Sequence, residues 1–178
     1  MPEPALTPPQ TGPIAVIVGS KSDCELVRES KMFEVFKAVG VDATLSIVSA
    51  HRNADDLEKH CDSLADNGAE VFIAAAGLSA ALPAAIAAIL KFEFPVIGVP
   101  LPGGILNGLD AVMSILQMPQ GVPVAVVGSV GKAGLYNAAL IACQMLAMSN
   151  TDRADRLANH LRALSEAKPP KLRIGLDD

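Results

Sequence analysis

Two polar segments of the sequence combine residue types that could bind an anion and move a proton. Gly19-Ser20-Lys21-Ser22-Asp23 precedes an expected helix, whose first N–H groups and positive dipole end favour an anion such as phosphate. Ser49-Ala50-His51-Arg52-Asn53 places an imidazole, which can act as acid and base near neutral pH, beside a guanidinium that can hold phosphate or carboxylate through paired hydrogen bonds. Both segments also fit a purely structural role, because serine, aspartate and asparagine commonly cap helices.

A third segment, Gly77-Leu78-Ser79-Ala80-Ala81-Leu82-Pro83, offers shape rather than reactive side chains. Its small residues would let a ligand approach the backbone in a water-poor cavity, with Gly77 and Leu82 as candidate lining residues. Ordinary packing of a helix against a sheet would use the same residues. Two later loops, 102–108 and 128–134, could close over a ligand or be plain turns.

No pattern in the sequence indicates a nucleotide cofactor or a metal ion. The segment 19–23 matches neither the GxGxxG pattern of dinucleotide-binding proteins nor the GxxxxGK[ST] pattern of P-loops. His60 and Cys61 are adjacent, so on a helix their side chains point about 100° apart, and no cluster supplies the remaining metal ligands. We expect His60 and His160 to be structural.

The elements that must position these segments alternate between β-branched runs and helical patterns. Such alternation is typical of a parallel sheet covered by helices on both faces. The expected strands are 14–18, 43–48, 71–76, 95–100 and 123–127. The three segments described above follow the first three strands directly. Because ligands of open parallel sheets bind beyond the carboxyl ends of the strands, these segments should meet at one edge of the sheet.

Helical patterns fill the intervals between the expected strands and follow the last one. The expected helices are 23–39, a second one that ends at residue 68, 80–90, 107–117, 134–148 and 151–168. The last of these is mostly charged and carries Leu157, Leu161 and Leu164 on one face. We expect this face to dock on other apolar surface, in particular on a neighbouring subunit.

Composition and charge exclude several classes of protein. A chain of 178 residues with 51% hydrophobic and 19% charged residues can bury a single core and is not disordered over its body. The net charge of −5, without any basic run, argues against a nucleic-acid partner and favours a small-molecule ligand. The uncharged stretch 71–90 is long enough to raise the question of a membrane span, but Gly77, Ser79 and Pro83 favour a buried strand, turn and helix.

We expect three parts along the chain: a flexible N-terminal arm at 1–13, a catalytic α/β domain at 14–150, and a C-terminal helix and tail at 151–178. The arm lacks the basic start and apolar core of a secretory signal, and the three cysteines are too far apart for a disulfide framework. These features indicate a cytoplasmic protein with buried, reduced thiols. The nearly uncharged stretch 94–131 indicates more apolar surface than a monomer can hide, and therefore a homo-oligomer.

Five sequence segments, taken in order, resemble the family of carboxyaminoimidazole ribonucleotide mutases and aminoimidazole ribonucleotide carboxylases of purine biosynthesis. The segments are Gly-Ser-Lys-Ser-Asp at 19–23, Ser-Ala-His-Arg at 49–52, Leu82-Pro83, Gln-Met-Pro at 117–119 with Gly-Val-Pro at 121–123, and Gly-Lys-Ala-Gly at 131–134 leading to Asn-Ala-Ala-Leu at 137–140. The resemblance covers about residues 14–150.

The resemblance implies a flavodoxin-like, three-layer α/β subunit that forms a homo-octamer and uses neither a metal nor an organic cofactor. It implies that Ser20, Asp23 and Arg52 bind the ribose phosphate part of the substrate, that Ser49 lines the same pocket, and that His51 is the acid/base. The family's reaction moves a carboxyl group from the exocyclic nitrogen to ring carbon C4 of an aminoimidazole ribonucleotide. Carbon dioxide released in between needs a closed cavity, which the alanine-rich third loop could form.

The sequence departs from the family pattern in this third loop. The family usually reads Ala-His-Leu-Pro-Gly, whereas this chain reads Ala80-Ala81-Leu82-Pro83-Ala84 and lacks an imidazole that would have flanked the transferred carboxylate. The expected activity is the mutase reaction. Direct carboxylation of the ribonucleotide by free carbon dioxide and non-catalytic ribonucleotide binding are the alternatives.

Overall fold

Residues 11–167 are described by the computed structural model and contain one five-stranded parallel sheet with strand order β2-β1-β3-β4-β5. The strands are β1 (Ile14–Val18), β2 (Ala43–Ile47), β3 (Val71–Ala76), β4 (Val96–Pro100) and β5 (Ala125–Val126). Three of them, β1, β3 and β4, are buried along their whole length because helices cover both faces, which explains their continuous apolar sequences. The predicted strands are confirmed, although β5 is shorter than expected.

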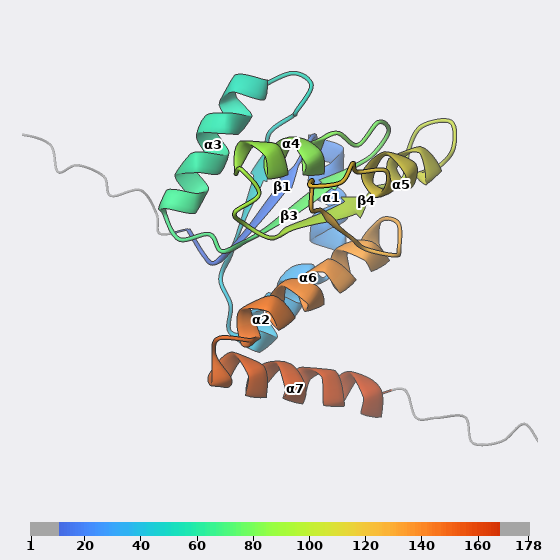
Figure 1. The fold of residues 1–178 in the computed structure, drawn as a ribbon. Helices are drawn as coiled ribbons and strands as arrows, with labels where there is room; N and C mark the ends of the chain where they lie inside the picture. Colours follow the sequence, from blue (N-terminus) through green and yellow to red (C-terminus); the bar gives the residue numbers. More distant parts are fainter. Residues whose placement is uncertain (1–10, 168–178) are drawn as a thin grey trace, which may run out of the picture.

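Seven helices surround the sheet in the described part of the chain (Figure 1). They are α1 (Lys21–Glu29), α2 (Met32–Val39), α3 (Ala54–Asp66), α4 (Leu82–Ile89), α5 (Leu109–Leu116), α6 (Lys132–Ala147) and α7 (Thr151–Glu166). On one face, α3, α4 and α5 pack against Ala15 and Ile17, whereas on the other α1, α2 and α6 pack against Ile14, Val16 and Val18. This layering and strand order define a flavodoxin-like fold and confirm the predicted class.

The single helix predicted over 23–39 is wrong, because the chain breaks it into α1 and α2. Lys31 has a left-handed backbone with φ of 64°, which ends the regular helical path. Ser30 is buried at the break, donates from Oγ to the carbonyl of Val27 at 2.7 Å, and accepts from the backbone N–H of Met32 at 3.3 Å. The serine therefore satisfies backbone groups that the interrupted helix leaves open.

The uncharged stretch 71–90 forms β3, a turn and the short helix α4, as predicted. Pro83 lies in the first turn of α4, where its missing N–H breaks no helical hydrogen bond. Between residues 11 and 167, no helix is both long and apolar enough to cross a membrane.

The C-terminal helix α7 docks on α6 and α2 of its own subunit (Figure 1). Leu157 is buried in the core cluster beneath α7. The expectation that this leucine contacts a neighbouring subunit is therefore wrong. Leu161 and Leu164 remain partly exposed. Tyr136 Oη and His160 Nε2 lie 3.4 Å apart between α6 and α7, in keeping with a structural role for this histidine.

Part of the predicted flexible arm at 1–13 is packed against the sheet. Gly12 is buried, and the carbonyl of Pro13 accepts hydrogen bonds from the N–H groups of Glu70 and Val71 at 2.8 and 3.0 Å. Residues 1–10 of the arm and residues 168–178 of the predicted tail lie outside the described residues. The three cysteines are buried and unpaired, as predicted.

Candidate active site

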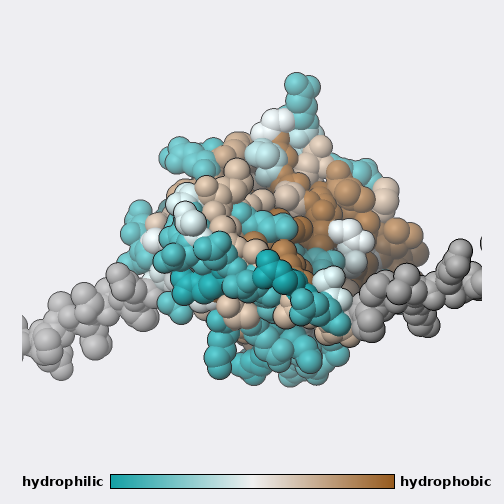
Figure 2. Space-filling model, turned by 90° about the horizontal axis from the view of Figure 1, so that it is seen from below, coloured by the Kyte–Doolittle hydropathy of each residue, from teal (hydrophilic) through white to brown (hydrophobic). Residues whose placement is uncertain are grey.

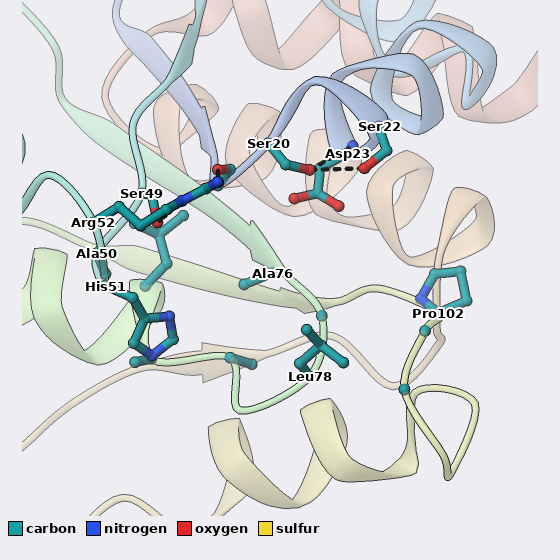
Figure 3. Close-up of a pocket in the computed structure, with 17 residues that line it drawn as sticks. Ser20, Ser22, Asp23, Ser49, Ala50, His51, Arg52, Ala76, Leu78 and Pro102 are labelled. Carbon is teal, nitrogen blue, oxygen red and sulfur yellow. Dashed lines mark hydrogen bonds between the residues drawn. The ribbon is translucent and has the colours of Figure 1, made fainter.

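The loops that follow β1, β2, β3 and β4 line one cleft at the carboxyl edge of the sheet (Figure 3). The cleft has a volume of about 540 Å³, within the usual range for small-molecule sites. All seven candidate residues from the sequence line it: Ser20, Asp23, Ser49, His51, Arg52, Gly77 and Leu82. The fold thus brings together residues that lie up to 62 positions apart, because β2 and β3 both flank β1.

The loop after β1 leads straight into α1 and presents hydroxyl groups to the cleft. Ser20 caps the helix, since its Oγ accepts from the N–H of Asp23 at 3.2 Å. The same oxygen lies 2.8 Å from Oγ of Ser22. Ser20 therefore has the structural role considered from the sequence and also lines the cleft at the positive end of the helix dipole, where an anion is stabilised.

The loop after β2 holds the guanidinium of Arg52 along the cleft wall (Figure 3). Its Nη2 donates to the carbonyl of Gly19 at 3.2 Å, and its Nε lies 3.5 Å from Oγ of the buried Ser49. These contacts connect two strand-end loops and orient the cation beside the first turn of α1. A phosphate bound there would meet both a charge and helix N–H groups.

His51 lies on the same loop, with its ring toward the loop that follows β3. Its Nε2 is 3.5 Å from Oγ of Ser79. Figure 3 shows the other ring nitrogen, Nδ1, turned toward the cleft. Nδ1 has no hydrogen-bond partner within residues 11–167, so a bound ligand could exchange a proton with it.

Sequence reasoning missed Ser79, because the segment 77–83 offers mainly small and apolar residues. Its hydroxyl was visible in the sequence, but the contact joins residues 28 positions apart and depends on the placement of two loops. The other third-loop residues contribute shape. Leu82 is almost completely buried and begins α4, and Ala81 forms part of the cleft wall at the position where the family pattern has histidine.

Only one of the two later loops reaches the cleft. Pro102, Gly103 and Gly104 line it. Gly104 has φ of 67°, and a Cβ there would collide with the carboxylate of Asp110 and approach Leu78 Cδ2 to 2.9 Å. Glycine is therefore needed where this loop packs on the loop that follows β3. The loop 128–134 does not line the cleft.

The charged side chains in the cleft wall are few, and the rest of the wall is mostly small or apolar. Asp23 and Arg52 are the acidic and basic residues that line it beside His51. His60 lies outside the cleft on α3, and burial lowers the pKa of its imidazole. No group of three or more His, Cys, Asp or Glu side chains in the described range is placed to hold a metal ion.

The fold and the cleft define a flavodoxin-like α/β protein with a small-molecule site at the carboxyl ends of its strands. Residues 13–167 match the AIR carboxylase family, and the chain belongs to that family. The polar residues of the cleft lie in two of the segments on which the resemblance was based.

Individual relatives agree with the family assignment. The chain is 44% identical over 144 residues to N5-carboxyaminoimidazole ribonucleotide mutase of Saccharolobus solfataricus, which covers 81% of this chain and 87% of that protein. It is 40% identical over 153 residues to the N5-carboxyaminoimidazole ribonucleotide mutase of Escherichia coli K12. This match covers 86% of this chain and 88% of that protein. The crystal structure of Treponema denticola PurE superposes with a TM-score of 0.75 at 24% identity, covers 86% of this chain and 92% of that one, and supports the fold.

Proposed function

We propose that this protein is an isomerase that converts N5-carboxyaminoimidazole ribonucleotide into its C4-carboxylated isomer. The observation that carries the proposal is the meeting of His51 and Arg52 with Ser20 and Asp23 in one cleft, although they come from two separate loops. Relatives with 40% and 44% identity over most of the chain carry the name of this mutase.

In the proposed binding mode, the substrate phosphate binds Arg52 and the first turn of α1, and Asp23 accepts hydrogen bonds from ribose hydroxyls. Ser49 lies behind Arg52 and orients it. The imidazole ring of the substrate then lies against the small residues of the third loop, between Gly77 and Leu82. This part of the wall contains no charged side chain, so released carbon dioxide would be held away from water.

Two proton transfers by His51 complete the reaction. Protonated His51 gives its Nδ1 proton to the exocyclic nitrogen as the bond from that nitrogen to the carboxyl carbon breaks and carbon dioxide leaves. Ring carbon C4 then attacks carbon dioxide, a C–C bond forms, and the C4 proton moves to Nδ1. The histidine returns to its starting state, so the reaction needs no added acid, base or co-reactant.

Direct carboxylation of the free ribonucleotide is a second candidate, because the five segments shared with the family do not separate this reaction from that of the mutase. A single-turnover experiment separates the two. N-carboxylated substrate with a ¹³C carboxyl group is mixed with enzyme in unlabelled bicarbonate. The mutase retains the label in the product, whereas a carboxylase that uses free carbon dioxide dilutes it. Binding without any product would support a non-catalytic ribonucleotide-binding protein.

We also propose that the protein is a homo-oligomer, an octamer by family resemblance, that works in the cytoplasm. Its buried, unpaired thiols suit a reducing compartment. Figure 2 shows a continuous hydrophobic area on the side of the molecule where α5 lies. Large apolar side chains are exposed there on α5 and the preceding loop: Ile105, Leu106, Leu109, Met113 and Leu116. A second copy of the chain would remove this surface from water.

A further inference from the structure

Ser79 and His51 form an exposed contact that connects two strand-end loops. Ser79 lies after β3 and His51 after β2, and β1 runs between these strands in the sheet. Their side chains approach to 3.5 Å between Oγ and Nε2. Ser79 itself does not line the cleft, whereas His51 does. The side chain of Ser79 therefore reaches the cleft through its contact with the histidine.

The backbone around Ser79 is held in an unusual conformation. Leu78 and Ala80, on either side, have φ of 56° and 25°, values that residues with a Cβ rarely adopt. Ala80 is buried, and its N–H donates to the carbonyl of Gly77 at 3.0 Å, which closes the turn. Strained residues of this kind persist where the surrounding structure fixes them, and they concentrate at functional sites. The turn gives Ser79 a fixed place against His51.

We propose that Ser79 is the positioning residue for His51, and that its hydroxyl oxygen accepts a hydrogen bond from Nε2–H. This inference rests on the proposed function of His51 in moving protons. A histidine with its Nε2 proton held in this way carries the lone pair of its neutral form on Nδ1, the nitrogen turned toward the cleft.

A hydroxyl group suits this position better than a carboxylate would. It fixes the ring without adding the negative charge by which a carboxylate would favour the imidazolium form. The other ionisable side chains of the cleft wall are Asp23 and Arg52. Asp55 and Asp56 follow the His51 loop in the chain, in the first turn of α3. The 3.5 Å separation is long for a hydrogen bond, and such contacts shorten when a ligand closes the site.

The first test measures activity with the N-carboxylated substrate. Ser79→Ala should lower kcat about 3- to 10-fold, the effect of one neutral hydrogen bond, leave KM unchanged, and move the pH profile of kcat. Ser79→Thr, which keeps a hydroxyl, should restore both kcat and the profile. Ser63→Ala is the matched control, because Ser63 is an exposed serine on α3 outside the cleft. Loss of the Ser63 hydroxyl should change neither kcat nor its pH profile.

The second test needs no activity and therefore separates this inference from the proposed function. The chain has three histidines, so ¹⁵N-labelled ring nitrogens give few signals, and His51→Asn identifies those of His51. At a pH where the ring is neutral, the wild-type protein should show the Nε2–H tautomer of His51, and Ser79→Ala should raise the share of the Nδ1–H tautomer toward that of a free histidine side chain. An unchanged ratio in Ser79→Ala, or a drop in kcat that Ser79→Thr does not restore, would overturn the proposal.

Discussion

Arg52 donates a hydrogen bond from Nη2 to the carbonyl oxygen of Gly19 across 3.2 Å. The contact connects residues 33 positions apart in the sequence and joins the loop after β2 to the loop after β1. Because these strands are parallel neighbours, both loops leave the sheet at the same edge. The guanidinium is thus held in place before a ligand binds, which reduces the conformational entropy lost on binding.

Replacement of Arg52 should weaken binding of the ligand's phosphate. Arg52→Ala is expected to cost about 1.5–3 kcal/mol of binding free energy, the value of a charge-assisted hydrogen bond. Calorimetry with aminoimidazole ribonucleotide measures this loss. The corresponding nucleoside, which has no phosphate, should bind the variant and the wild type equally.

Arg28→Ala is the control for that measurement, since Arg28 is an exposed arginine of α1 outside the cleft. It should leave the affinity for the ribonucleotide unchanged. If Arg52→Ala weakened nucleoside and ribonucleotide equally, the phosphate assignment would be contradicted.

Replacement of His51 should stop the chemistry and preserve binding. His51→Asn removes the proton-transfer group but keeps a polar side chain of similar size, so turnover should fall by about 10²–10⁴ while ribonucleotide affinity stays near that of the wild type. Single-turnover kinetics and calorimetry measure the two effects. His160→Asn, on α7 and outside the cleft, should retain full turnover. Wild-type turnover in His51→Asn would remove this residue from the mechanism.

The exposed apolar surface on α5 and the preceding loop should form a subunit interface. Ile105, in the loop before α5, is 98% exposed, and Met113 is an exposed apolar side chain on α5 itself. Light scattering on the wild-type protein should give a molar mass several times the 18.4 kDa of one subunit. Ile105→Asp combined with Met113→Asp should lower that mass, because burial of an unpaired carboxylate is costly.

Lys59→Asp controls for the change of charge in this experiment, because Lys59 is exposed on α3, away from this surface. This variant should keep the wild-type mass. A double variant that retained the full mass would show that assembly uses another face.

Two buried cysteines should make stability fall at high pH. Burial raises the pKa of the Cys61 thiol from 9.0 to about 12, with a further contribution from Asp62. Burial raises the pKa of Cys143 to about 11, partly offset by Arg153. Both values lie above those of the unfolded chain, so the stability these thiols contribute is complete below about pH 9 and is lost as the pH rises to about 11–12.

Urea unfolding at several pH values measures this effect. Between pH 9 and 11, the free energy of unfolding should fall less steeply in Cys61→Ala than in the wild type, whatever the stability of the variant at neutral pH. In the same range, iodoacetamide should modify Cys61 and Cys143 of the folded protein far more slowly than in urea. Rapid modification of both thiols in the native protein would contradict their burial.

The sequence by itself determined the strands and the loops that carry polar residues. A strand buried on both faces must be apolar along its length, so β1, β3 and β4 are visible as continuous runs. Their parallel arrangement then requires the loops that follow them to meet at one edge, and the cleft contains all seven candidate residues. These conclusions depend on local patterns and on one general rule of α/β folds.

The tertiary structure alone decided which side chains touch and which segments stay apart. The exclusion of the loop 128–134 from the cleft and the burial of Leu157 within its own subunit depend on packing between elements distant in sequence. The break at Ser30 rests on local hydrogen bonds and a left-handed residue, which hydrophobic periodicity does not report. The contact of Ser79 with His51 also requires the order β2-β1-β3, which sets two loops on either side of β1. Hydrophobic periodicity reports the face that a residue presents, but it carries no information about which residue lies opposite.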